Sequence, residues 1–212
     1  MAKDSDRDPK QSGFSRRDLL RGGAAGAVVG SVVPRALQAE QAAADTASGA
    51  ALVGPGPVPM TFTINGRRYQ AELEPRVTLL DALRNHLDLT GAKKVCDRAT
   101  CGACTVLVSD QPVYSCTLLA IEAQGAPVTT IEGLGTPEQM HPIQASFVEN
   151  DAQQCGYCTP GFVVACKAFL DANPNPSLEQ IERGLGGNLC RCGTYDGIKQ
   201  VLLAGGRPAR GG

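Results

Sequence analysis

The chain has 212 residues, which is enough for one or two domains with an apolar core. Hydrophobic residues make up 42% of it and its formal net charge is −1, so no basic stripe favours a nucleic acid partner. No segment reaches the roughly 18 consecutive apolar residues of a membrane-spanning helix, so we expect no membrane span.

The N-terminal segment has the parts of an export signal. Ser15-Arg16-Arg17 opens a charged stretch, Gly22–Val33 is short and weakly apolar, and Ala-rich residues follow. Paired arginines before such a segment are typical of the twin-arginine route. We therefore expect residues 1–44 to be a twin-arginine signal peptide and the protein to be periplasmic. Residues 45–59, rich in Ala, Gly and Pro, are predicted to be a linker.

Residues 60–132 are predicted to form a small α+β domain, with order beginning at Thr61. The alternating segments TFTI and RRYQAEL flank Asn65-Gly66, which is a strong hairpin signal. Thr78 can cap a helix with an apolar stripe made of Leu79, Leu80, Leu83 and Leu87. The other expected elements are a strand at Thr105–Val108, a turn at 109–112, a short strand into Cys116 and a strand at Val128–Ile131.

Residues 133–206 are predicted to form a helical domain. Proline positions and capping signals predict helices at Pro137–Asn150, at Pro160–Ala172, after Ser177 and at Thr194–Ala204. Residues 207–212 are predicted to be a flexible tail. The expected fold class is therefore α+β, with a sheet domain followed by a small bundle of four helices.

Eight of the nine cysteines fall into two sets of four, and their odd number excludes complete disulfide pairing within the chain. The first set has the spacing C-x4-C-x2-C-x11-C, the plant-type [2Fe–2S] ferredoxin pattern. The second set has the spacing C-x2-C-x31-C-x-C, which taken alone also suits a structural zinc ion. The sets are Cys96, Cys101, Cys104 and Cys116, and Cys155, Cys158, Cys190 and Cys192.

The residues beside these cysteines favour an anionic cluster. A glycine next to a ligand lets a backbone N–H approach sulfur, and such glycines are Gly102, Gly156 and Gly193. Thr159 and Pro160 follow Cys158 as a helix N-cap and a first helical residue, and Thr194 follows the last cysteine in the same manner. Arg191 adds a cation near the second set or forms a surface ion pair.

The other candidate residues have structural interpretations. Cys166 lies mid-helix among apolar residues, which is typical of a buried small hydrophobe. His86 and His141 have no partner histidine or carboxylate cluster nearby. We find no serine triad, no phosphate-binding loop and no paired carboxylates suited to acid–base catalysis. The sequence therefore predicts a chain that carries electrons and does not transform a substrate alone.

Three segments, CGACTVLV, QCGYCTPGFV and GNLCRCGTYDGI, resemble the iron–sulfur subunits of the molybdenum hydroxylases, the xanthine dehydrogenase and aldehyde oxidoreductase family. The similarity runs from about Thr61 to about Leu203. With its leader, the chain is most similar to the small subunits of exported bacterial aldehyde oxidoreductases. The resemblance implies a plant-type 2Fe-2S ferredoxin-like (β-grasp) domain and a four-helix domain, each with one [2Fe–2S] cluster.

The same resemblance implies a large partner subunit with a molybdopterin cofactor, where an aldehyde or an N-heterocycle is hydroxylated. Electrons would pass from that centre to the second cluster, then to the first, and on to an FAD subunit or a cytochrome. In such proteins the residues matching Gln154 and Cys192 lie against the pterin, so both are candidate molybdopterin contacts. The chain has Val95 and Ala99 where the family commonly has glycine, so we expect a slightly reshaped first loop.

Two other functions fit parts of the pattern. A free-standing two-cluster ferredoxin-type carrier would need no catalytic partner, although a second buried cluster has no use in a lone carrier. A secreted scaffold held by disulfides or zinc would be colourless, whereas an iron–sulfur protein is brown.

Overall fold

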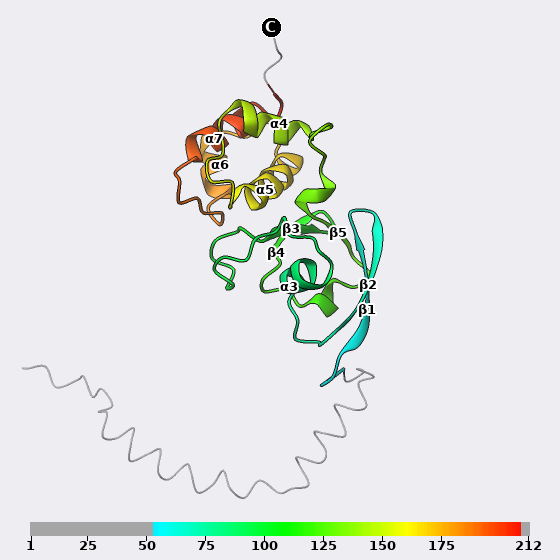
Figure 1. Ribbon diagram of the computed structural model, residues 1–212. Helices are drawn as coiled ribbons and strands as arrows, with labels where there is room; N and C mark the ends of the chain where they lie inside the picture. The colour runs from blue at the N-terminus through cyan, green and yellow to red at the C-terminus, as the bar shows by residue number, and fades with distance from the viewer. Residues whose placement is uncertain (1–52, 209–212) are drawn as a thin grey trace, which may run out of the picture. The chain divides into compact units, whose positions relative to one another are not determined.

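The computed structural model describes residues 53–208. The predicted signal peptide at residues 1–44, residues 45–52 of the predicted linker and residues 209–212 of the predicted tail lie outside this range. Within the described part, a five-stranded sheet is followed along the chain by four helices, α4 to α7 (Figure 1). The expected α+β fold class is confirmed.

The sheet has the strand order β2-β1-β5-β3-β4. β1 (Val58–Ile64) and β2 (Arg67–Leu73) form an antiparallel hairpin. β5 (Pro127–Thr129) lies between β1, to which it is parallel, and β3 (Thr105–Val108), to which it is antiparallel. β4 (Gln111–Tyr114) pairs with β3 at the edge of the sheet. This arrangement brings the end of β4 beside the start of β3.

The hairpins differ slightly from the sequence prediction. Val58, Pro59 and Met60 pair with β2, so ordered structure begins before Thr61 and the end of the predicted linker is a strand. Asn65 and Gly66 have φ of 50° and 74°, which confirms the predicted tight turn. The second turn is shorter than predicted: residues 109 and 110 have positive φ, and 111 and 112 already belong to β4.

The helix predicted after Thr78 is present but changes its winding. The Thr78 hydroxyl accepts a hydrogen bond from the Asp81 backbone N–H at 3.1 Å and so caps α3 (Leu79–Asp81). The chain then continues as a π-helical turn over Ala82–His86. Leu79, Leu80 and Leu83 are fully buried as predicted, and Leu87 is half-buried against the same core.

Short 3-10 helices replace part of the predicted irregular and extended structure. They cover Ala120–Ala123 and Ile131–Gly133. The strand predicted at Val128–Ile131 therefore ends at Thr129. Asn65 holds this end, because its side chain donates to the Thr130 hydroxyl at 2.9 Å and accepts from the Thr130 N–H at 2.9 Å.

The four helices start close to the predicted positions, with two corrections. They are α4 (Pro142–Glu149), α5 (Thr159–Ala172), α6 (Leu178–Gly184) and α7 (Tyr195–Leu203). α4 begins at Pro142 instead of Pro137, because His141 caps it by accepting the Ile143 N–H at its Nδ1 atom. α5 begins at Thr159, with Cys158 at the N-cap position and no side-chain capping bond, so the predicted Thr159 cap is wrong.

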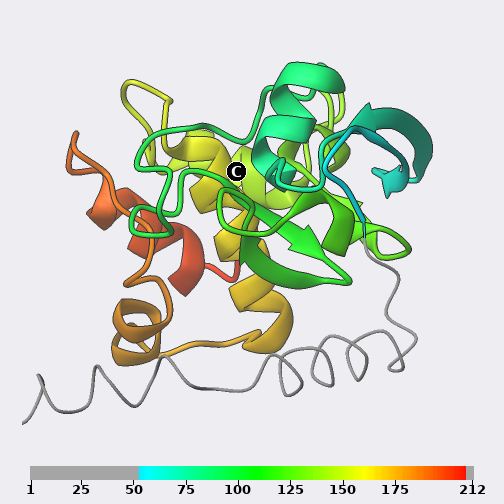
Figure 2. The ribbon, with the colours of Figure 1, turned by 90° about the horizontal axis from the view of Figure 1, so that it is seen from below.

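Three groups of buried side chains hold these elements together. One lies under the sheet and includes Phe62 and Leu80, and a second lies among the helices and includes Phe147 and Val201. The third joins the two regions, since Leu107 from β3 packs with Val164 and Ala168 from α5. Both ribbon views show α5 beside β3 and β4 (Figures 1 and 2). The sheet and the helices are therefore packed directly on one another.

Candidate metal centres

The first set of cysteines is positioned by one loop and the strand pair β3–β4. Cys96, Cys101 and Cys104 lie in the loop that leads into β3, and Cys116 follows β4. The Ser115 hydroxyl and backbone N–H both donate to the Cys104 carbonyl, at 2.7 and 3.4 Å. These bonds tie the segment after β4 to the loop. Cys104 and Cys116 are buried, whereas Cys96 and Cys101 are half-buried.

The thiols of the first set lie close enough to influence one another's pKa. Cys101 acts to lower the pKa of Cys96, and the charges of Cys116 and Cys101 both act to raise that of Cys104. Backbone groups of the loop also point at sulfur. The Thr100 N–H donates to Cys96 Sγ and the Ala99 N–H donates to Cys116 Sγ, each at 3.4 Å. Such donors stabilise negative charge on the sulfur atoms.

The first set contains one thiol with a lowered pKa and one with a raised pKa. Burial acts to raise the pKa of Cys96, but hydrogen bonds from the side chain and backbone of Thr100 and from the Arg98 backbone lower this pKa to about 6. Burial, helped by the neighbouring Cys116 thiol, raises the pKa of Cys104 to about 12. One thiol therefore ionises readily, whereas the other needs a nearby positive charge before it becomes a ligand.

The first loop has an unusual backbone. Asp97, Ala99 and Gly102 have φ of 56°, 54° and 69°, in the left-handed region that favours glycine. Of the two positions where the family commonly has glycine, Ala99 therefore carries a conformational cost and Val95 does not. Val95 is instead an exposed apolar side chain, with 56% of its surface accessible. The departure that matters for the loop is the one at residue 99.

The second set of cysteines lies at the start of two helices. Cys155 and Cys158 precede α5, whereas Cys190 and Cys192 precede α7. Cys190 is buried and Cys158 half-buried, while Cys155 and Cys192 are exposed. Cys190 and Cys155 both act to raise the pKa of Cys158, and the charges of the same two residues act to raise that of Cys192, so the four thiols lie close together. The positive ends of α5 and α7 therefore face the same group of sulfur atoms, as the sequence predicts.

Cys190 has a dense set of hydrogen-bond partners. The Thr194 hydroxyl donates to its Sγ atom at 3.2 Å. Burial acts to raise the pKa of Cys190, but hydrogen bonds from Thr194, from the Cys192 backbone and from the Cys158 thiol lower it to about 7. Burial and the adjacent Cys190 raise the pKa of Cys158 to about 12. The second set thus repeats the combination of one acidic and one buried thiol.

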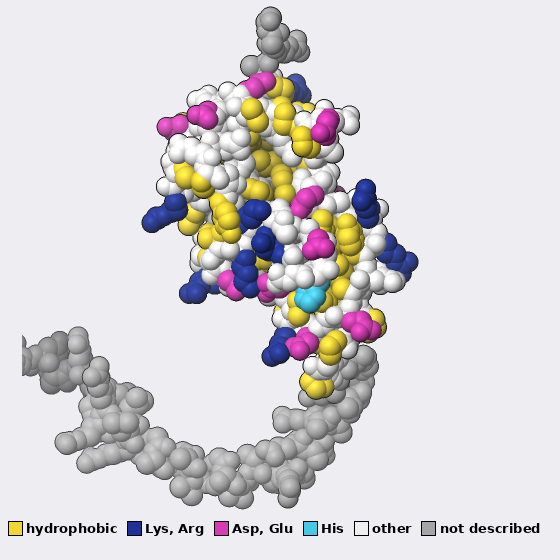
Figure 3. Space-filling model, viewed as in Figure 1, with side chains coloured by type: hydrophobic (Ala, Val, Ile, Leu, Met, Phe, Trp, Pro, Cys, Tyr) yellow, Lys and Arg dark blue, Asp and Glu magenta, His cyan; other side chains and the backbone are white. Residues whose placement is uncertain are grey.

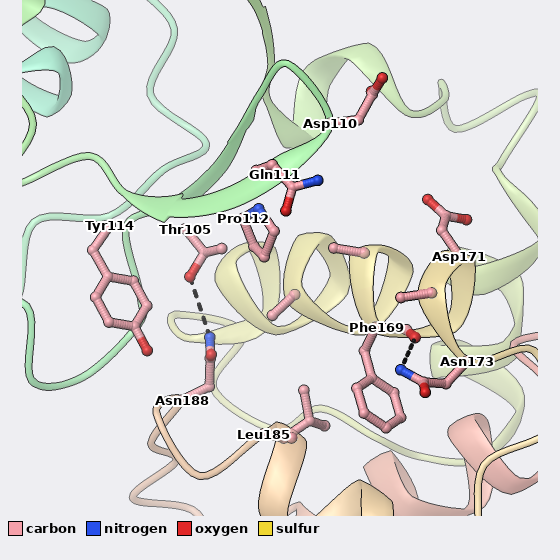
Figure 4. A pocket seen from close by; sticks show the side chains of 14 residues that line it. Thr105, Asp110, Gln111, Pro112, Tyr114, Phe169, Asp171, Asn173, Leu185 and Asn188 are labelled. Atoms are coloured by element: carbon pink, nitrogen blue, oxygen red, sulfur yellow. Dashed lines mark hydrogen bonds between the residues drawn. The ribbon is translucent and has the colours of Figure 1, made fainter. Parts of the chain in front are cut away.

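The two sets are joined by a short hydrogen-bonded contact. The Leu189 N–H, next to Cys190, donates to the Cys101 carbonyl at 3.0 Å. The buried Asn188 side chain donates to the Gly102 carbonyl at 3.1 Å. It also donates to the Thr105 hydroxyl at 3.4 Å (Figure 4). Cys101 of the first set and Cys190 of the second are therefore connected through one residue and one hydrogen bond.

Glycines allow this contact. A Cβ atom at Gly161 in α5 would overlap the carbonyl oxygen of Gly102 and approach Ala103 Cα to 2.9 Å. A Cβ atom at Gly102 would lie 2.5 Å from the Asn188 side chain. The first loop and the start of α5 thus approach each other more closely than any residue with a side chain would permit.

None of the nine cysteines, all of which are described, forms a disulfide. In residues 53–208, no three His, Cys, Asp or Glu side chains converge as the ligands of a single metal ion would. A [2Fe–2S] cluster does not need such convergence on one point, because its four cysteines are shared between two iron ions. Cys166 is fully buried, and burial strongly raises its pKa, as expected for a structural thiol.

Other candidate residues lie at the surface near the second set. Gln154 and Arg191 are exposed beside the exposed ligands. Gly156 and Gly193 have φ of 79° and 84°, so the backbone conformation favours glycine there, whereas a Cβ atom at either position would meet nothing within 4 Å. Sequence reasoning missed Asn188, because its hydrogen bond to Gly102 spans 86 residues of sequence.

The helical region exposes apolar surface. Tyr157 is 51% exposed between two ligands, and Met140 and Val148 are 46% and 55% exposed. Met140 and Val148 line a groove of about 370 Å³ together with Pro160. Figure 3 shows apolar patches over the helices, with acidic and basic side chains interspersed on the viewed face. Within residues 53–208, no helix combines the length and hydrophobicity needed to cross a bilayer.

Family models match both halves of this arrangement. Residues 62–127 match the 2Fe-2S iron-sulfur cluster binding domain, and residues 130–202 match the [2Fe-2S] binding domain. The second match favours a [2Fe–2S] cluster over a zinc ion at the second set, because that family is described by [2Fe–2S] binding.

Relatives and solved structures agree with these matches. The chain is 39% identical over 210 residues to the aldehyde oxidoreductase iron-sulfur-binding subunit PaoA of Escherichia coli K12, covering 92% of this chain and 89% of the relative. It is 41% identical to a probable xanthine dehydrogenase subunit from Bacillus subtilis, covering 75% and 93%. Quinoline 2-oxidoreductase from Pseudomonas putida 86 superposes with a TM-score of 0.67 at 38% identity, covering 70% of this chain and 91% of that chain.

The contact between the two sets gives a prediction about stability. Replacing Gly161 with Ala places a methyl group against Gly102 and Ala103, so we expect the free energy of unfolding to fall by roughly 1–3 kcal/mol. The measurement is the thermal unfolding midpoint of the iron-loaded chain, followed by visible absorbance and circular dichroism.

Gly186→Ala is the matched control for this prediction. A Cβ atom there meets nothing closer than 3.7 Å, and Gly186 has no positive φ. We expect a midpoint close to that of the unmodified protein. Equal midpoints for the two variants would contradict the close approach between the first loop and α5.

Proposed function

Because this chain belongs to the iron–sulfur subunits of the molybdenum hydroxylase family, we propose that it is an electron-transfer subunit holding two [2Fe–2S] clusters. Each cluster, when bound, accepts and releases one electron. The protein supplies the ligands, the hydrogen bonds to them and a route for the electron, and needs no catalytic acid or base. The observation that carries the proposal is that two sets of four thiols, none of them in a disulfide, lie in the two regions that match [2Fe–2S]-binding families.

We assign one cluster to each set of cysteines. In the first, Cys96 and Cys101 hold one iron, and Cys104 and Cys116 hold the other. In the second, the ligand pairs are Cys158 with Cys190 and Cys155 with Cys192. The hydrogen bonds to sulfur from Thr100, Ala99 and Thr194 support this assignment, because they offset the negative charge of four thiolates around two ferric ions.

The proposed electron route runs from the second cluster to the first. Cys155 and Cys192 are exposed, so the second cluster lies close to a surface that a partner can cover. The hydrogen bond from the Leu189 N–H to the Cys101 carbonyl supplies a short connection to the first loop. Electrons then leave through the half-buried Cys96 side of that loop.

The proposed partner is a large subunit with a molybdopterin cofactor. Gln154 and Cys192 are exposed beside the second set, and we propose that they contact the pterin. The exposed Tyr157 and the apolar groove near Met140 offer buried contact area for such a subunit. An FAD subunit or a cytochrome would accept the electrons. The names of the relatives favour an aldehyde or an N-heterocycle as the substrate class.

Ligand substitutions test the two-cluster assignment. We expect about four irons per chain, and about two after either Cys104→Ser or Cys158→Ser, with one of two electron paramagnetic resonance signals lost in each case. The measurement is iron and sulfide analysis combined with the spectra. Cys166→Ala is the control, because burial alone shifts the pKa of that thiol with no part played by either set, and all of the iron is expected to remain.

Two results would contradict the assignment. One is an unmodified chain with about two irons and a single signal. The other is loss of iron in Cys166→Ala equal to that in the ligand variants.

Co-purification tests the partner. We expect the tagged chain from its native host to elute with a large molybdenum-containing subunit. Tyr157→Ala removes exposed aromatic surface between two ligands, so more of the chain is expected to elute free. Leu178→Ala, a similarly exposed position at the start of α6, is the control. A chain that elutes alone with full iron content would favour a free-standing carrier.

Substitution of the paired arginines tests the proposed export. We propose that Arg16 and Arg17 direct the protein through the twin-arginine route, so that clusters are inserted before export. Replacing both with Lys is expected to leave the protein in the cytoplasm, as measured by cell fractionation. The exposed pair Arg67-Arg68 on β2, replaced with Lys in the same way, is the control. Normal export of the Arg16-Arg17 variant would reject the proposal.

A further inference from the structure

One side-chain hydroxyl reaches a sulfur atom from a buried position. Thr194 has only 7% of its surface exposed, and its Oγ1 atom donates to Cys190 Sγ at 3.2 Å. It stands at the N-cap position of α7 and yet makes no side-chain capping bond. The hydroxyl is thus directed at the sulfur instead of at the helix backbone.

The neighbouring residue fixes this geometry. The Tyr195 hydroxyl accepts the Cys190 N–H at 2.8 Å and donates to the Cys190 carbonyl at 3.1 Å. Its ring packs edge-on against Phe162 of α5, with centroids 6.2 Å apart. Cys190 is therefore held at its backbone by Tyr195 and at its sulfur by Thr194, so the bond to sulfur has a defined direction.

The first set has a comparable threonine in a different environment. The Thr100 N–H donates to Cys96 Sγ at 3.4 Å, and the Thr100 side chain acts to lower the pKa of that thiol. Thr100 is exposed, however, so water can replace its hydroxyl. No such replacement is open to Thr194, because its side chain is enclosed. The chain thus offers two similar bonds that differ chiefly in burial.

A hydrogen bond to a ligand sulfur changes the reduction potential of an iron–sulfur cluster. Reduction adds one negative charge, and a donor stabilises the more negative state more strongly. In a low-dielectric site the same bond has a larger effect than at the surface. The donor therefore raises the potential, and the buried donor raises it more.

We propose that Thr194 acts through Cys190 as a positioning and tuning residue that raises the reduction potential of the second cluster. The inference rests on the proposed assignment of Cys155, Cys158, Cys190 and Cys192 as ligands of that cluster. A higher reduction potential favours electron uptake by the second cluster, which is the one nearest the proposed partner.

The test compares Thr194→Val, Thr194→Ser and Thr100→Val in the full-length, cluster-loaded protein. Redox titration followed by electron paramagnetic resonance gives the reduced fraction of each cluster. For Thr194→Val we expect the ratio of reduced to oxidised second cluster at a fixed potential to fall about tenfold, which corresponds to about 59 mV for one electron. Thr194→Ser keeps the hydroxyl and is expected to retain the original ratio.

Two internal controls accompany this test. The first cluster of Thr194→Val is expected to titrate as in the unmodified protein. Thr100→Val is expected to leave the first cluster nearly unchanged, because water takes the place of the lost hydroxyl. A general structural disturbance would instead move both clusters, or would not be reversed by Ser.

The possible failures are distinguishable. If the unmodified protein lacks a second signal, the ligand assignment fails. If that signal is present but keeps its potential in Thr194→Val, the role of Thr194 is rejected. Should Thr194→Val lose the second cluster, Thr194→Ala takes its place in the titration, and an unchanged potential of the second cluster in that variant overturns the proposal.

Discussion

The close approach of the Cys101-Gly102 carbonyls to Asn188 and Leu189 is the constraint on which the rest of the molecule depends. It requires glycine on both sides, at Gly102 and Gly161, because a side chain at either position would occupy the space of the other domain. The buried amide of Asn188 then satisfies a carbonyl that would otherwise be buried without a partner. As a result, the first cysteine loop is shaped partly by the helical domain, and the two sets of cysteines are held in place by the same contact.

Burial and hydrogen bonding shift the pKa values of the thiols in opposite directions. Cys158 lies next to Cys190, yet burial raises the pKa of the former to about 12, whereas donors lower that of the latter to about 7. If the two sets hold iron as proposed, Cys190 is the readier ligand, because only thiolates bind iron, and Cys158 would lose its proton as the metal binds. Cys96 and Cys104 show the same contrast in the first set.

Sequence reasoning succeeded where spacing reflects local geometry and failed where distant segments decide. The Asn65-Gly66 turn and the Ser177 cap follow from neighbouring residues, and the structure contains both. The two ligand sets stay a prediction from their spacing. Thr159 looked like a cap, but the helix starts at that residue, with Cys158 in the N-cap position. Asn188 carries no local signal, since its partner lies 86 residues away. Contacts between the two domains could therefore not be predicted from the sequence.

The distribution of exposure argues that the second site is complete only in an assembly. Cys155 and Cys192 are exposed, whereas Cys190 and Thr194 on the inner side are buried. A cluster held there would have one face in a fixed, low-dielectric environment and the other in water. Water on that face would screen the partner's charges and add its own hydrogen bonds to sulfur. A covering subunit would remove this water, so the properties of the second cluster would be set jointly by Thr194 from within and by the partner from outside.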